Sequence, residues 1–317
     1  MEFTKRLLLG AAAVVAVSLF GLPADAAEKI KLAGVVPGSI TDQAFNQVVY
    51  EGYVLARDTL GIEMAYTEKV KQADQSEVLE DYARRGYNVV IGAGGEFVES
   101  TKRAAKRYPD TMFVCLNCAL IDGVATLNYD NNAIGYILGY VGGKMSDTGK
   151  LGLISGQKIK PAVDLAEGMR KGLKDATGGG EVLVTYTNDW DDVAKAKEAA
   201  LAQISQGATA ILPYLDNGIV GVIQGLEDKG KWALGAITDL GKTKPETNLI
   251  STVQSWQQAV LAFVKLAMEG KAERKDYLYS VGTKPLSLGT INPKVPADVR
   301  AELDKIVADI VAGRFKK

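Results

Sequence analysis

Aromatic and polar side chains occur together where predicted strands end. Phe45 and Asn46 follow the first such strand, Trp190 follows a later one, and Tyr214 and Asp216 end another. Aromatic rings can stack on a flat ligand, while amide and carboxylate groups can hydrogen-bond its edge or a sugar hydroxyl. The pattern therefore predicts a binding site for a small, ring-shaped, polar molecule.

Taken one by one, these residues also have plainer interpretations. Phe45 could equally belong to the core, Trp190 could cover the start of a helix, and Asp42 alone fits a helix N-cap better. The site rests on their joint position, because open α/β sheets bind ligands beyond the carboxyl ends of their strands. The candidates at strand ends are Asp42, Phe45, Asn46, Gly94, Asn117, Trp190, Tyr214, Asp216 and Asp239.

The composition excludes several kinds of catalytic site. The 317 residues include no His, so Ser-His-Asp triads, Cys-His pairs and His-ligated metal sites are impossible. No spacing marks a pair of catalytic carboxylates, and we predict no catalytic residue, no metal and no cofactor. Lys and Arg number 37 against 38 Asp and Glu, and this balance argues against a nucleic-acid partner.

Strand-like and helix-like segments alternate along the chain in two similar series. Such alternation predicts parallel sheets with helices on both faces, and hence an α/β protein of two Rossmann-like lobes. The first series has strands at 30–36, 63–70, 88–93 and 111–117, with helices at 43–60, 75–85 and 96–107. The second has strands at 151–155, 181–187, 209–215 and 232–237, with helices at 161–176, 191–206 and 218–229.

The C-terminal segments form no third series. Elements left over after two lobes indicate that the chain crosses between the lobes more than once. We therefore expect a type I periplasmic-binding-protein fold, with a multi-stranded hinge and a central cleft. The prediction assigns 27–125 and 254–282 to the N-terminal lobe, and 126–253 and 283–317 to the C-terminal lobe.

The first 26 residues have the pattern of a secretory signal peptide. Lys5 and Arg6 precede an apolar stretch at 7–22, and Ala24-Asp25-Ala26 is a typical cleavage signature. The alternative, a membrane anchor, would need a longer apolar stretch. No Cys lies nearby to carry a lipid. We expect cleavage after Ala26 and export to a Gram-negative periplasm.

Export makes the two cysteines informative. Cys115 and Cys118 end a strand-like run, whereas a redox C-x-x-C motif normally opens a helix. An oxidising compartment permits a disulfide between them. A structural disulfide and two unreactive thiols remain open as alternatives.

Several segments resemble the basic membrane protein family, the purine nucleoside receptor type of substrate-binding protein of ABC importers. Residues 41–46 read T-D-Q-A-F-N and are followed by Y-E-G at 50–52, similar to the family's "D-K-S-F-N … E-G". Residues 86–92, 108–113 and 135–139 resemble further family motifs in the same order. The resemblance extends over nearly all of the chain after residue 26.

The resemblance implies residue roles. Phe45 matches the family's stacking Phe, Asn46 the polar residue beside it, and Trp190 and Tyr214 fall where the family has cleft aromatics. Asp239 falls in a turn that contacts ribose. The chain departs from the family at three places. Ile237 replaces an Asp of that turn, and Asn117 replaces another Asp. The third departure is a missing Lys after the next strand, where the chain instead has Trp256, which we add as the tenth candidate site residue.

These departures remove groups that would bind ribose and add an aromatic ring. We therefore predict a periplasmic binding protein for a free purine base such as adenine, or for a purine nucleoside, acting as a monomer with an inner-membrane ABC permease. A sugar or autoinducer-type binder on the same fold is the alternative. An exported enzyme such as a nucleoside hydrolase is a third, disfavoured by the absence of His.

Overall fold

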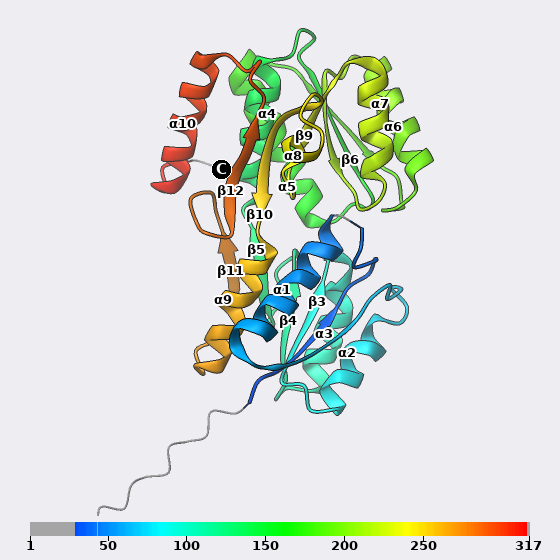
Figure 1. Ribbon diagram of the computed structural model, residues 1–317, viewed down its shortest axis with the longest axis vertical. Coiled ribbons are helices and arrows are strands. Elements are labelled where there is room, and N and C mark those ends of the chain that lie inside the picture. The colour runs from blue at the N-terminus through cyan, green and yellow to red at the C-terminus, as the bar shows by residue number, and fades with distance from the viewer. Residues whose placement is uncertain (1–28, 43, 316–317) are drawn as a thin grey trace, which may run out of the picture.

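The computed structural model describes residues 29–42 and 44–315. The predicted signal peptide and Gln43 lie outside these residues. The chain forms two lobes, one above the other in Figure 1, and each is built on a six-stranded sheet. This arrangement confirms the predicted α/β fold of two lobes.

The first sheet has the strand order β11-β5-β4-β3-β1-β2, and all its pairs are parallel. Its central strands are buried along their length and rich in Val and Ile, as expected for a sheet covered on both faces. The strands are β1 (Lys31–Val35), β2 (Glu63–Thr67), β3 (Val89–Ala93), β4 (Met112–Leu116), β5 (Ala125–Tyr129) and β11 (Asp276–Tyr279).

Alternate side chains of this sheet enter two separate clusters. Leu32 and Ile91 pack with residues of α1 (Phe45–Leu60) and α9 (Trp256–Met268). Their neighbours Ala33 and Val90 face the other way, toward α2 (Gln75–Arg84) and α3 (Val98–Arg107). A one-turn 3-10 helix, η1 (Gly95–Phe97), links β3 to α3.

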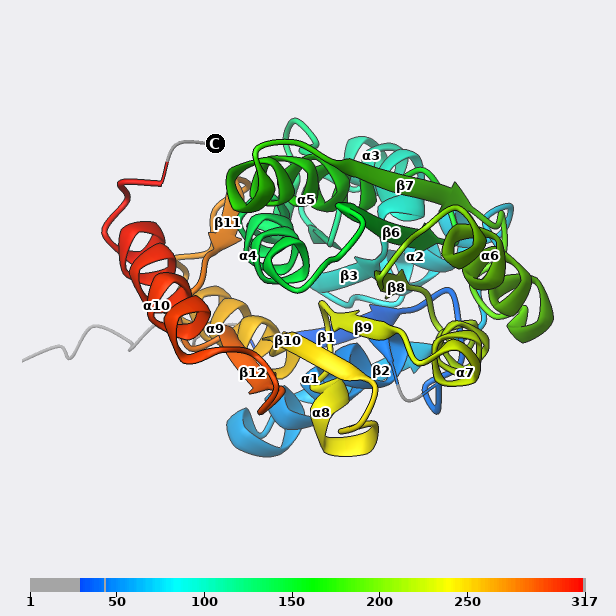
Figure 2. The ribbon, with the colours of Figure 1, turned by 90° about the horizontal axis from the view of Figure 1, so that it is seen from above.

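The second sheet has the order β12-β10-β9-β8-β6-β7, and only the edge pair β10–β12 is antiparallel. Helices again cover both faces (Figure 2). Its strands are β6 (Lys150–Ser155), β7 (Glu181–Tyr186), β8 (Ala210–Tyr214), β9 (Trp232–Gly235), β10 (Asn248–Gln254) and β12 (Leu286–Ile291). Its helices are α4 (Asn131–Lys144), α5 (Lys160–Thr177), α6 (Val193–Ser205), α7 (Ile219–Lys229), α8 (Leu240–Thr243) and α10 (Ala297–Val311).

The chain passes between the two sheets three times: from β5 to α4, from β10 to α9, and from β11 to β12. The first passage lies later than the expected boundary after residue 125, because β5 pairs with β4 and β11 in the first sheet. The second passage follows Gln254, which ends β10 in the second sheet. These strand pairings correct the lobe bounds by a few residues.

Candidate functional site

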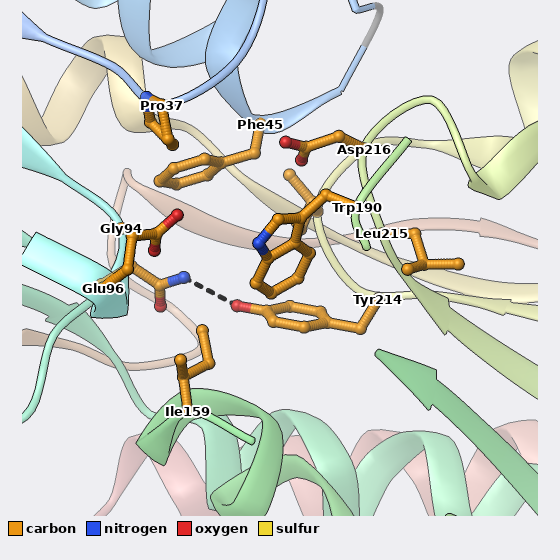
Figure 3. Close-up of a pocket in the computed structure, with 11 residues that line it drawn as sticks. Pro37, Phe45, Gly94, Glu96, Ile159, Trp190, Tyr214, Leu215 and Asp216 are labelled. Atoms are coloured by element: carbon orange, nitrogen blue, oxygen red, sulfur yellow. Dashed lines mark hydrogen bonds between the residues drawn. The ribbon is translucent and has the colours of Figure 1, made fainter. Parts of the chain in front are cut away.

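A cavity of about 350 Å³ lies between the lobes, at the carboxyl ends of strands from both sheets (Figure 3). This volume includes open solvent, and the space that a water-sized sphere can occupy is only about 30 Å³, so the cavity is narrow with the lobes in this position. The lining combines aromatic, aliphatic and acidic side chains from both lobes. The residues are Pro37, Phe45, Gly94, Glu96, Asn117, Ile159, Trp190, Tyr214, Leu215, Asp216 and Ile237.

The structure brings six of the ten predicted site residues to this cavity. They come from five different strand ends or helix starts, so their meeting depends on both sheets. The six are Phe45, Gly94, Asn117, Trp190, Tyr214 and Asp216. Asp42 and Asn46 lie directly behind the wall, whereas Asp239 and Trp256 lie elsewhere.

Asp42 organises the beginning of α1. Its carboxylate accepts hydrogen bonds from the backbone N–H groups of Ala44 (2.9 Å), Asn46 (3.0 Å) and Gln47 (3.0 Å). These are N–H groups that a helix start leaves without intrahelical partners. Asp42 therefore fixes the direction in which Phe45 and Asn46 leave α1. The N-cap itself is Ala44, so Asp42 binds the first-turn N–H groups from two residues before the expected capping position.

Asn46 joins the two lobes. Its Nδ2 donates to Asp42 Oδ2 at 2.7 Å within the first lobe, and to Asp216 Oδ2 at 2.7 Å across the cleft. Its Oδ1 accepts the Gly38 backbone N–H at 3.0 Å. Burial raises the pKa of the Asp216 carboxyl well above its usual value, and the nearby charge of Asp42 raises it further. One amide thus holds two buried carboxyls together.

Asn117 makes the second contact across the cleft. It lies in the left-handed region at φ 56°, inside the loop that Cys115 and Cys118 close by a disulfide. The Asn117 Nδ2 donates to the Tyr214 hydroxyl at 2.7 Å, while its Oδ1 is buried and has no hydrogen-bond partner among residues 29–42 and 44–315. The bonded cysteines match the disulfide alternative, and they shape a turn that carries a cavity residue.

Trp190 lies on the second lobe, between β7 and α6. Its backbone carbonyl accepts the N–H groups of Asp216 (3.1 Å) and Gly218 (3.0 Å), which ties this loop to the end of β8. The indole ring packs on Gly156, where any Cβ would collide with the ring. Within the part of the chain that the structure describes, the buried indole Nε1 has no hydrogen-bond partner. The ring is therefore positioned by its surroundings, while its N–H is available to a ligand.

Trp256 and Asp239 do not line the cavity. Trp256 is fully buried at the start of α9, with the edges of Phe45 and Tyr129 packed against it at ring-centre distances of 5.8 and 4.5 Å. Asp239 accepts hydrogen bonds from the backbone N–H and hydroxyl of Thr290, both at 3.0 Å, and from the N–H of Gly241. Trp256 therefore supports the ring of Phe45 from behind, and Asp239 ties α8 to β12.

The cavity also has residues outside our candidate list, of which Glu96 is the most informative. Glu96 belongs to η1, directly after the glycines that follow β3, and burial raises its pKa to about 7. Its place after Gly94 and Gly95 at a strand end was the signal that could have found it. Pro37, Ile159, Leu215 and Ile237 add apolar contacts that no motif marks.

Metal binding and membrane insertion find no support in the described part of the chain. Residues 29–42 and 44–315 contain no group of three or more His, Cys, Asp or Glu placed to hold a metal ion. Within the same ranges, no helix is both long and apolar enough to cross a bilayer.

Two parallel-sheet lobes around a cavity of this kind define a type I periplasmic-binding-protein fold. The chain belongs to the family of PnrA-like ABC transporter substrate-binding proteins, whose model matches residues 29–312. It is therefore a solute-binding protein of an ABC transporter, a non-enzymatic class with a small ligand and a permease partner. The family consists of extracytoplasmic binding proteins.

Relatives of the chain are named for different activities. The transcriptional activator protein med of Bacillus subtilis (strain 168) is 30% identical over 282 residues, 88% of each chain. A purine-binding protein of Brucella abortus (strain 2308) is 24% identical over 307 residues, 96% of this chain and 87% of the relative. A crystal structure of an ABC transporter solute-binding protein from Aeropyrum pernix K1 has a TM-score of 0.81 at 19% identity, covering 90% of this chain and 92% of that one, which bears on the fold alone.

Proposed function

We propose that this binding protein takes a free purine base, or a closely related flat heterocycle, into the cavity between its lobes. The observation that carries the proposal is the pair of rings, Phe45 from the first lobe and Trp190 from the second, that line one small cavity. Aromatic rings on a planar ligand contribute dispersion and stacking energy without requiring a particular hydrogen-bond pattern. The Brucella relative named as a purine-binding protein supports the same ligand class.

The surroundings favour a base over a nucleoside. Asp239, which falls in the turn that resembles a ribose-binding turn, is engaged by Thr290. Ile237, which stands where the family has a second Asp of that turn, presents an aliphatic side chain to the cavity. A ribose placed beside Ile237 would find no acceptor on that side chain, and each unmade buried polar contact costs about 1–3 kcal/mol.

Binding would work by closure of the two lobes about the three chain passages. The open lobes admit the ligand, and the hydrogen bonds from Asn46 to Asp216 and from Asn117 to Tyr214 form as the lobes meet. The closed form would then be recognised by a permease in the inner membrane. In this proposal the protein acts in the periplasm as a monomer, with neither a cofactor nor a nucleic-acid partner.

Calorimetry with adenine, adenosine and guanosine tests the ligand, after native mass spectrometry has shown whether the purified protein retains a molecule. Adenine is expected to bind tightest. Tighter binding of either nucleoside would refute the free-base proposal, and binding of ribose or glucose with no response to purines would favour the sugar alternative. Phe45→Leu, which keeps an apolar side chain but removes the ring, is expected to weaken adenine binding while the melting temperature reports on folding.

A further inference from the structure

Glu96 contributes a carboxyl group to the lining of the cavity. Within the described ranges, no side chain hydrogen-bonds to this carboxyl or forms an ion pair with it. Burial raises its pKa, and the hydrogen bond from its own backbone N–H lowers it. Figure 3 shows Glu96 at the cavity together with Phe45 and Trp190. A buried carboxyl in this position costs free energy unless something binds to it.

The acid is not compensated by a cation. No Lys or Arg belongs to the described lining of the cavity, and the second acid of the lining, Asp216, comes from the opposite lobe. Asp216 already accepts a hydrogen bond from Asn46, whereas Glu96 accepts none from a side chain. An anionic ligand would meet two carboxyls and no positive charge, so the cavity disfavours phosphates and carboxylates.

Three polar groups remain for a ligand to satisfy. Besides Glu96, these are Asn117 Oδ1, a buried acceptor, and Trp190 Nε1, a buried donor, neither of which has a hydrogen-bond partner among the described residues. Glu96 and Asn117 follow neighbouring strands, since Ala93 of β3 pairs with Leu116 of β4. The first-lobe wall therefore offers a carboxyl group beside an amide oxygen, a combination that is rich in acceptors.

The chemistry that fits this wall is an amino group attached next to a ring nitrogen. One oxygen of Glu96 can accept an amino N–H while the other pairs with the ring nitrogen, whichever of the two partners holds the proton. The second amino N–H can then reach the amide oxygen. An oxo group in the same place would put its oxygen opposite Asn117 Oδ1, and two acceptors facing each other are unfavourable.

We propose that Glu96 is the specificity-determining residue of the cavity, and that it selects an amino-substituted nitrogen heterocycle over oxo-substituted, unsubstituted and anionic analogues. The proposal rests on the proposed purine-binding function and adds which purines are preferred. It assigns to Phe45 and Trp190 the general affinity for a flat ring, and to Glu96 with Asn117 the choice between substituents.

Calorimetry with adenine, hypoxanthine and unsubstituted purine tests the assignment. Wild-type protein is expected to bind adenine at least tenfold tighter than the other two. Glu96→Leu removes the carboxyl group and is expected to weaken adenine binding roughly 10- to 100-fold, because a charge-assisted hydrogen bond is lost. The adenine preference should then fall below threefold. Glu96→Met, of nearly the same length, repeats the test if the Leu variant fails to fold.

Two controls separate specificity from general effects. Glu99→Met removes an exposed acid three residues further along, on α3, and should leave all three affinities unchanged. Phe45→Leu should weaken all three compounds together and keep their ratio. Tight binding of hypoxanthine or purine with no preference for adenine, or a preference that survives Glu96→Leu, overturns the inference and leaves the proposed function standing. Binding of no purine at all refutes both.

Discussion

Asn46 offers the sharpest test of how the lobes are held together. Its Nδ2 donates to Asp42 Oδ2 and Asp216 Oδ2, each at 2.7 Å, while its Oδ1 accepts the Gly38 N–H. Asn46→Asp keeps the acceptor for Gly38 and the shape of the side chain. It removes the donor, and with it both the bond to Asp216 across the cleft and the bond to Asp42 inside the first lobe. The replacement therefore tests the contact between the lobes together with this bond at the start of α1.

The size of the effect follows from that bond. A hydrogen bond to a charged group contributes about 1.5–3 kcal/mol, and each 1.4 kcal/mol changes an equilibrium constant tenfold. Loss of the Asn46–Asp216 bond should shift the balance toward open lobes roughly 10- to 150-fold. The new carboxyl beside Asp42 and Asp216 acts in the same direction, because three neighbouring acids disfavour one another's ionised forms.

Small-angle scattering and adenine calorimetry measure this shift. The radius of gyration of Asn46→Asp is expected to exceed that of the wild type, and its adenine affinity to fall by the factor given above. Asn88→Asp is the matched control: Asn88 Oδ1 accepts the Lys31 N–H at 2.8 Å, inside the first lobe, so its replacement should leave both readouts unchanged. If Asn46→Asp scatters like the wild type and binds within threefold, the Asn46–Asp216 bond does not stabilise closure.

Three further predictions concern the disulfide, Glu96 and helix packing. Replacing Cys115 and Cys118 by Ser should lower the free energy of unfolding by about 2 kcal/mol, the value for a four-residue loop. It should also weaken adenine binding, because Asn117 lies inside this loop. Unchanged urea unfolding and unchanged adenine affinity would contradict this prediction. Burial raises the pKa of Glu96 from 4.5 to about 7, so the stability it contributes is complete below pH 4.5 and lost as the pH rises through 7. This loss of unfolding free energy is about 3 kcal/mol. Glu96→Gln should abolish this pH dependence, because an amide does not titrate. If the unfolding free energies of the variant and the wild type change in parallel between pH 5 and 8, Glu96 does not titrate in this way. Gly135→Ala would drive a methyl group into the Leu165 carbonyl of α5 and should lower the melting temperature by several degrees, whereas Gly179→Ala, with open space around it, should not.

The architecture could be predicted because each strand and helix carries its own signal. Local patterns that tertiary contacts reinforce include the apolar runs of β3 and β4 and the helical spacing of apolar residues in α1 and α3. The expected first lobe boundary lies too early because the membership of β5 depends on its pairing with β4 and β11. The pairing of β5 with β11 joins segments about 150 residues apart, and no local pattern records it.

The site could be predicted only to the level of strand ends. Phe45, Trp190 and Tyr214 could be predicted as candidates because aromatic and polar residues occur together at strand ends, and the two sheets bring these three residues to one cavity. Trp256 has the same residue type and a similar position, yet Phe45 and Tyr129 enclose it in the core. Glu96 occupies a strand end as well, but only the three-dimensional arrangement shows that no side chain of the described residues hydrogen-bonds to its carboxyl. Residue type and position along the chain do not determine which way a side chain in a turn faces.

The acids around the cavity connect ligand binding to closure. Glu96 comes from one lobe and Asp216 from the other, so bringing the lobes together without a ligand places both in a low-dielectric space that lacks a cation. A ligand that donates N–H groups can satisfy Glu96 and stack on Phe45 of the first lobe, and it gains the contact with Trp190 of the second lobe only when the lobes are near one another. Such a ligand therefore binds the closed form better than the open one, and differential affinity is what shifts a conformational equilibrium. In this reading the unpaired carboxyl disfavours empty closure and so makes the closed form a signal that ligand is bound.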